Sequence, residues 1–72
     1  MKTLIINKQN GHEVQENQWV TRKDRQGFYS RYEVLEIYEE TEEARVKYIT
    51  SDDGYLYTTQ TFHKLGLKRV ML

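Results

Sequence analysis

Residues 31–50 read RYEVLEIYEETEEARVKYIT, and after a short turn residues 55–59 read YLYTT. Apolar and polar side chains alternate in residues 44–50, which is the period of two typical of a β-strand with one buried face. A helix over residues 33–47 is the alternative, but the apolar positions do not continue at helical spacing beyond Tyr38. The sequence therefore predicts two consecutive antiparallel hairpins with short turns.

The first of these strands, residues 31–38, has an irregular apolar pattern. Tyr32 and Val34 would lie on one face, whereas Leu35 and Ile37 would lie on the other. Such a slip predicts either a strand buried on both faces or a bulge that bends the strand. Because one strand of a small barrel must bend to serve both of its sheets, this strand is the expected one.

Turn and cap residues mark the elements that follow. Residues 53–54 are Asp-Gly, a pair typical of tight hairpin turns, and the acidic run at 39–43 is expected to form the tip of the preceding hairpin. Thr61 and Gly66 have the chemistry to begin and end a single helical turn. A last strand is predicted at residues 67–72.

The N-terminal part of the chain has a weaker pattern. A strand is predicted at residues 3–7, and Asn10 followed by glycine is typical of a turn. In residues 12–18 only Val14 is apolar. We therefore predict a strand or hairpin extension over residues 1–18, attached to one small domain.

The layout of residues 19–72 resembles an SH3-like barrel, the fold of Tudor, KOW and chromo-like modules. A short strand at 19–22, a polar loop at 23–30, the bent strand, two hairpins, a helical turn and a final strand follow one another in the order of that fold. The resemblance implies an all-β, SH3-like antiparallel barrel of about five strands with one short helical turn. Small stand-alone chains of this kind also resemble proteins carried by phages or mobile elements, which implies a regulator of a host protein.

The charges of the chain balance to zero but are unevenly distributed. Residues 22–31 combine four basic side chains with Phe28 and Tyr29, whereas residues 33–43 are rich in glutamate. One basic and one acidic surface are therefore expected on the same domain.

Two classes of binding function fit these features. One tryptophan, six tyrosines and two phenylalanines are more rings than so small a barrel can bury, so some are expected at a contact surface for a partner protein. The alternative is nucleic-acid binding by the basic aromatic segment 22–31, which offers phosphate contacts beside stacking rings. The predicted partner-binding residues are Trp19, Arg22, Arg25, Phe28, Tyr29 and Tyr55.

Catalytic and metal-binding motifs are absent from the sequence. There is no cysteine, the histidines are His12 and His63, and Ser30 and Ser51 lie in predicted turns without an identifiable base. We therefore expect no enzyme activity, no metal and no cofactor. The only apolar run near the N-terminus, residues 4–6, is too short for a membrane span or a signal-peptide core, which favours a cytoplasmic protein without membrane contact.

Overall fold

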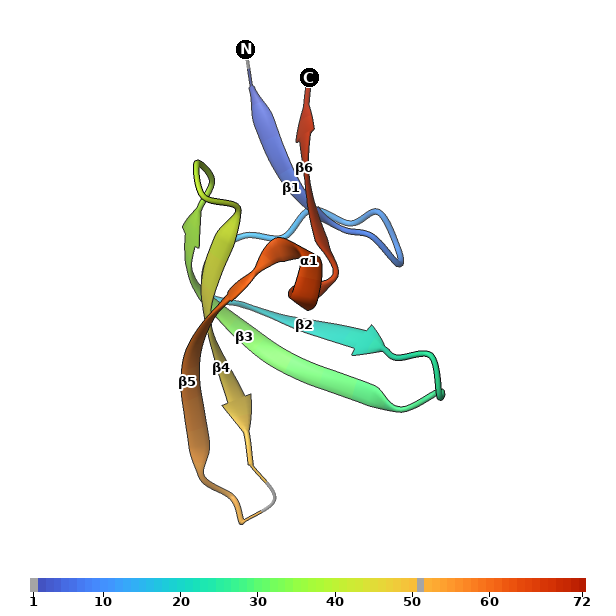
Figure 1. Ribbon diagram of the computed structural model, residues 1–72, viewed down its shortest axis with the longest axis vertical. Helices are drawn as coiled ribbons and strands as arrows, with labels where there is room; N and C mark the ends of the chain where they lie inside the picture. Colours follow the sequence, from blue (N-terminus) through green and yellow to red (C-terminus); the bar gives the residue numbers. More distant parts are fainter. Residues whose placement is uncertain (1, 51) are drawn as a thin grey trace.

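The computed structural model of the chain describes residues 2–50 and 52–72 (Figure 1). These residues are mostly β-structure, as predicted, with one short helix. The elements are β1 (Thr3–Asn7), β2 (Gln18–Lys23), β3 (Tyr29–Tyr38), β4 (Glu43–Ile49), β5 (Tyr55–Thr61), α1 (Phe62–Leu65) and β6 (Leu67–Met71).

The strands form two antiparallel sheets. One sheet has the order β2–β3–β4–β5, and the other consists of β1 and β6. In Figure 1, β1 and β6 lie side by side at the end that carries both termini, whereas the β2–β3 and β4–β5 hairpins diverge toward their turns. The sheets are not closed into a barrel in the described residues, so the SH3-like barrel stays a prediction.

The bent strand β3 contains a bulge at the predicted point. Its register with β4 shifts between Val34 and Glu36, which leaves Leu35 as the extra residue. Beyond the bulge, Ile37 lies opposite Ala44 and packs against the core. The extra residue resets the alternation, so β3 can bury apolar side chains on one face along both of its halves.

The β4–β5 turn has the predicted Asp-Gly pair. Asp53 adopts a positive φ of 62°, and the Thr50 N–H donates to the Gly54 carbonyl at 2.9 Å. Aspartate tolerates this left-handed backbone better than most residues, which explains its position in the turn. Ser51 belongs to the same predicted turn and lies outside the described residues.

The core lies between the inner face of the four-stranded sheet, α1 and the β1–β6 pair. Both predicted parts of the chain, 1–18 and 19–72, contribute to it. On the inner face of β4, Val46 is fully buried, whereas Tyr48 is only half-buried. The buried apolar residues are Ile5, Val14, Val20, Tyr32, Val34, Ala44, Val46, Phe62, Leu65 and Leu67.

The N-terminal segment departs from the predicted hairpin. β1 pairs with β6 over five residue pairs, and residues 12–18 form no strand before β2 begins at Gln18. A single bridge joins Ile6 to Glu13, and Val14 donates its N–H to the Ile5 carbonyl at 2.7 Å. Val14 is the only apolar residue in residues 12–18. A single bridge to β1 is therefore enough to place its side chain in the core, and no full strand is required.

Helix α1 has the caps that the sequence predicts. The Thr61 hydroxyl accepts the Lys64 N–H at 3.3 Å, and Gly66 ends the turn with a left-handed φ of 74°. The turn directs Leu65 into the core, and the hydroxyl of Tyr32 donates to the Leu65 carbonyl at 2.9 Å. This buried bond connects the middle of β3 to the end of α1.

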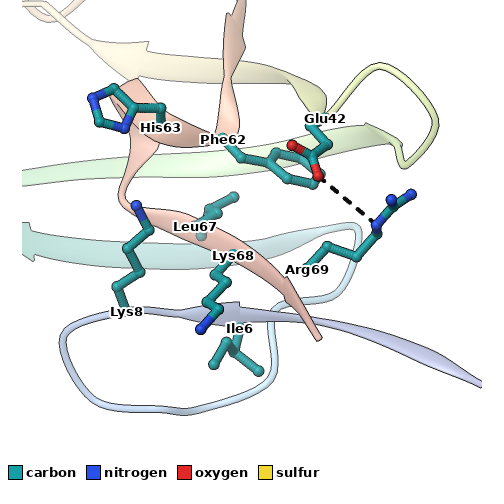
Figure 2. Close-up of a pocket in the computed structure, with 8 residues that line it drawn as sticks. All are labelled: Ile6, Lys8, Glu42, Phe62, His63, Leu67, Lys68 and Arg69. Carbon is teal, nitrogen blue, oxygen red and sulfur yellow. Dashed lines mark ion pairs between the residues drawn. The ribbon is translucent and has the colours of Figure 1, made fainter. Parts of the chain in front are cut away.

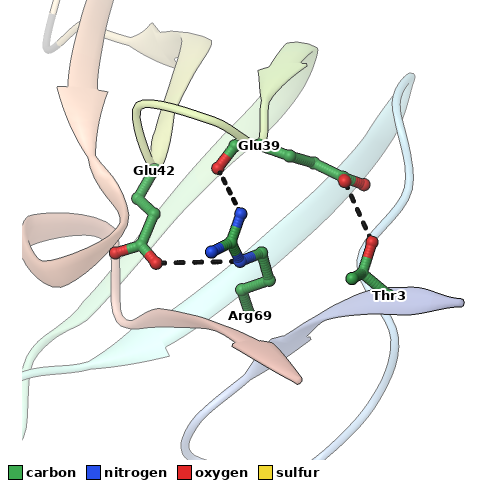
Figure 3. A network of polar contacts seen from close by, with 4 residues as sticks. All are labelled: Thr3, Glu39, Glu42 and Arg69. Carbon is green, nitrogen blue, oxygen red and sulfur yellow. Dashed lines mark hydrogen bonds and ion pairs between the residues drawn. The ribbon is translucent and has the colours of Figure 1, made fainter. Parts of the chain in front are cut away.

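The acidic β3–β4 turn connects the two sheets (Figure 3). Thr3 donates to the Glu39 carboxylate at 2.9 Å, and the Arg69 guanidinium donates to the Glu39 carbonyl at 3.1 Å. Arg69 also lies 3.8 Å from the Glu42 carboxylate. Two glutamates of the acidic run therefore form polar contacts with β1 and β6. Exposed ion pairs of this kind contribute little to the stability of the fold.

We predict that Tyr32→Phe destabilises the fold at neutral pH. The substitution keeps the buried ring but leaves the Leu65 carbonyl without its donor, which costs about 1–3 kcal/mol. Urea unfolding followed by circular dichroism measures this loss, and Tyr38→Phe is the matched control because its hydroxyl bonds an exposed carboxylate. Equal effects of the two substitutions would contradict the assigned role of the Tyr32 hydroxyl.

The same residue gives the fold an alkaline pH dependence. Burial raises the pKa of Tyr32 well above that of an ordinary tyrosine, the Tyr48 phenol adds to the increase, and Arg22 partly opposes it. The stabilisation is complete below the unfolded pKa of about 10 and is lost as the pH rises above that value. The free energy of unfolding should therefore fall above about pH 10, and less steeply in Tyr32→Phe than in the native chain.

Candidate binding surface

The strand registers align side chains from all four strands on the solvent side of the larger sheet. Trp19 lies opposite Glu33, Glu33 opposite Lys47, and Lys47 opposite Tyr57. Directly opposed residues share one side of a sheet, and this side faces away from the core. We call this side the outer face. The half of it that is nearer to the β2–β3 and β4–β5 turns is its aromatic half, which carries the side chains of Trp19, Thr21, Lys23, Tyr29, Arg31, Glu33, Arg45, Lys47, Ile49, Tyr55, Tyr57 and Thr59.

Lysine 47 is the centre of this face. Its Nζ lies 4.6 Å from the ring centroid of Tyr55 and 5.7 Å from that of Trp19, and it forms a 2.9 Å ion pair with Glu33. The hydrogen bond to Glu33 raises the pKa of Lys47. Arg31 approaches Trp19 as well, with Cζ 5.0 Å from the ring centroid. Lys47 therefore lies between the rings of Trp19 and Tyr55, and Arg31 is a second cation on Trp19.

The rings of the outer face are accessible. Tyr29, Tyr55 and Tyr57 are 72%, 58% and 53% exposed, and Trp19, packed between its two cations, is 37% exposed. Ile49 adds an exposed aliphatic group beside Tyr55. Exposed apolar groups that gather on one face, rather than scatter singly, are typical of a contact surface.

The charge of the sheet changes sign along the strands. Toward the β3–β4 turn, Glu36 lies opposite Arg45 and Glu43 opposite Tyr38. The Tyr38 hydroxyl donates to Glu36 at 2.9 Å, and this bond raises the pKa of Tyr38. The aromatic half of the outer face carries four cations against Glu33 and, at its boundary with the acidic end, Glu36 opposite Arg45. An anionic ligand would therefore be held in this half and repelled from the acidic end.

Three of the predicted partner-binding residues gather on the outer face: Trp19, Tyr29 and Tyr55. They lie on an open sheet surface. Lys23 holds its Nζ 5.9 Å from the Tyr29 ring, where β3 begins. Phe28, 67% exposed, precedes Tyr29 in the β2–β3 turn and extends the aromatic surface beyond the strands.

Arg22, another of the predicted partner-binding residues, does not lie on the outer face. Its side chain lies on the opposite side of the sheet, where it donates to the Lys64 carbonyl at the end of α1. A Cβ at Gly66 would lie 3.2 Å from the Arg22 Nε, so the guanidinium packs closely under the helix end. Arg22 therefore has a structural contact to α1 that the sequence did not indicate, because the two segments are far apart in the chain.

Arg25 lies in the β2–β3 turn. It lines a pocket of about 670 Å³ between the β2–β3 turn and the end of α1, together with Lys8 and His63. A second pocket, of about 720 Å³, lies between α1, β1 and β6 and shares these two residues (Figure 2). Lys68 also lines it, so the two pockets form a second basic region on another part of the surface.

Sequence reasoning missed a central residue of the outer face, Lys47. The signal was present, because alternation over 44–50 and 55–59 assigns odd-numbered residues to one side. Only the register between strands indicates that Lys47 lies beside Trp19 rather than beside other residues of β2 or β3. The ring–cation contacts were therefore not predictable from either strand alone.

Comparison of the chain with protein-family models, with curated proteins and with solved structures finds no match. Across residues 2–50 and 52–72, no cluster of three or more His, Cys, Asp or Glu side chains could hold a metal ion. No helix in this described part of the chain has the length and apolar character needed to cross a membrane.

Proposed function

We propose that the chain is a non-catalytic binding module that holds single-stranded nucleic acid on its outer face. The observation that carries this proposal is the row of accessible rings and cations from Trp19 through Lys47 to Tyr55 and Tyr57. Unpaired bases stack on aromatic rings whatever their sequence, and cations between the rings neutralise the phosphates. The planar guanidinium of Arg31 offers a further stacking surface.

The charge pattern supports a single strand over a duplex. The aromatic half of the outer face is bounded by the glutamates around Tyr38, so a broad duplex would meet repulsive charge. A single strand can cross the β-strands near the two hairpin turns and avoid the acidic end. Exposed bases are also required for stacking, and a duplex keeps its bases inside.

Salt-dependent binding is the first test. Fluorescence anisotropy should detect single-stranded DNA or RNA at low salt and weaker binding of the matching duplex. If two to four phosphates are neutralised, the slope of log K against log salt should be about −1.5 to −3. No binding of any single strand at tens of micromolar protein would contradict the proposal.

Arg31→Gln and Lys68→Gln locate the site. The first removes a cation from the outer face and should reduce the salt slope by about 0.7. The second removes a cation from the pocket beside α1 and should leave binding unchanged. A larger effect of Lys68→Gln would assign the nucleic acid to the second basic region instead.

A partner protein is the second candidate ligand, and exposed Phe28 beside Tyr29 favours it. Tyrosine and tryptophan combine large contact area with a polar group, and such residues are frequent interface anchors. Tyr29→Ala should leave the melting temperature nearly unchanged and weaken binding by about 1–3 kcal/mol. If the chain is a regulator of a host protein, as its resemblance to phage-carried proteins implies, it would use this surface and bind with a weaker salt dependence than a nucleic-acid ligand.

We further propose that the domain is related to SH3-like barrels and acts in the cytoplasm. The order of β2 to β5, α1 and β6 supports the first statement, because it is the order expected for that fold. The absence of cysteine is compatible with the second. Neither statement is needed for the binding proposal, which rests on the outer face.

A further inference from the structure

Strand β5 has an unprotected edge. It is an outermost strand of the four-stranded sheet, and β2 is the other. At β2 the Gln9 side chain bonds both the N–H and the carbonyl of Lys23, and Asn7 donates to the Thr21 carbonyl. No corresponding bond from the described residues reaches the free edge of β5 between Tyr55 and Thr59.

The hydrogen-bond pattern identifies which groups of β5 are free. The Thr50 N–H donates to the Gly54 carbonyl at one end of the β4–β5 ladder, and the Phe62 N–H donates to the Glu42 carbonyl at the other. Bonded pairs in an antiparallel ladder recur at every second residue. Even-numbered residues of β5 therefore bond to β4, and Tyr55, Tyr57 and Thr59 direct their N–H and carbonyl groups to the free edge.

The composition of β5 gives this edge no protection against pairing. Its seven residues read YLYTTQT, with no charge and no proline, and its register with β4 runs without a bulge. Edge strands that avoid other chains usually carry lysine, proline or a bulge. β5 instead resembles an interior strand, since tyrosine and threonine favour β-structure.

We infer that β5 pairs antiparallel with β5 of a second copy of this chain. A two-fold axis at Tyr57 sets Tyr55 opposite Thr59 of the second copy, so all three free residues form bonded pairs. Leu56, 54% exposed, would then lie opposite Thr58 of the second copy on the inner side and lose water. A second copy is the occupant that the edge favours, because an uncharged strand matches itself and offers no charge to attract an acidic or basic peptide.

The cations of the outer face do not oppose this pairing. Lys47 lies one strand away from the edge, so the two copies of Lys47 would be about 14 Å apart, three strand spacings. That distance exceeds the screening length of about 8 Å at physiological ionic strength. The axis is perpendicular to the sheet, so both outer faces would lie on the same side of one continuous sheet.

Sedimentation velocity from micromolar to millimolar protein tests the pairing without any ligand. The native chain should pass from monomer to dimer, and Thr59→Pro should remain monomeric at every concentration. The Thr59 N–H faces the free edge, so proline removes an intermolecular donor and no bond to β4. Thr59→Val is the matched control and should dimerise like the native chain.

Tyr57→Lys provides a second variant if Thr59→Pro does not fold. It keeps every backbone donor but sets two lysines opposite each other at the two-fold axis, so it should also remain monomeric. A native chain that is monomeric throughout, or a folded Thr59→Pro chain that dimerises as well as the native one, would overturn the inference. Loss of nucleic-acid binding alone would not affect it, since neither experiment contains nucleic acid.

Discussion

Leu65→Ala is expected to lower the free energy of unfolding by about 2–5 kcal/mol. Leu65 is 1% exposed and is one of the two residues by which α1 enters the core. Truncating it removes apolar contacts and leaves a cavity that the short helix cannot close. A chain of this length has a total stability on the order of 4–11 kcal/mol, so the variant should lose a large part of it and unfold at a clearly lower urea concentration than the native chain.

Urea titration of both chains measures this effect, with Leu72→Ala as the matched control. Leu72 is 67% exposed at the C-terminal end, so the same truncation there should change stability by no more than about 0.5 kcal/mol. If Leu65→Ala were as mild as the control, α1 would not be a part of the core, and the described packing between α1 and the four-stranded sheet would be wrong.

Tyr55→Ala is expected to weaken the binding of single-stranded nucleic acid by about 1–3 kcal/mol, roughly 5- to 150-fold. The ring is 58% exposed and lies over the Lys47 ammonium, so its removal takes away a stacking surface and frees a cation. Since the ring is not part of the core, the melting temperature should change little. Anisotropy and thermal unfolding of the same sample separate the two effects.

Tyr38→Ala is the matched control for this prediction. Tyr38 is also a partly exposed tyrosine on the solvent side of the sheet, but it lies among the glutamates and bonds Glu36. Its removal should leave nucleic-acid affinity unchanged. Equal losses of affinity for Tyr55→Ala and Tyr38→Ala would indicate that nucleic-acid binding does not depend on the aromatic half of the outer face.

Local pattern predicted much of the fold. The alternation in residues 44–50, the slip at Val34 and Leu35, and the caps Thr61 and Gly66 each correspond to an observed strand, bulge or helical turn. These features depend on neighbouring residues, because side-chain period and backbone preference act over a few positions. The candidate surface was predicted in part, since Trp19, Tyr29 and Tyr55 share the outer face.

The remaining site residues could not be assigned from the chain alone. Arg22 was predicted to contact a partner, yet its guanidinium bonds the carbonyl of Lys64 at the far end of the sequence. Lys47 was not singled out, yet it joins Trp19 to Tyr55. Both contacts depend on how strands and helix are arranged in space. Elements that are neighbours in the fold can be separated by dozens of residues in the sequence.

The sequence by itself determined which segments are strands, where the chain turns and which strand bends. The tertiary structure alone decided that β1 pairs with β6, that the acidic turn bonds Arg69 and Thr3, and that the rings and cations of four strands form one face. The physical reason is that strand formation is local, whereas register is set by burying side chains from distant strands together. A shift of one residue in any pairing would turn the aromatic residues of that strand from the outer face to the core.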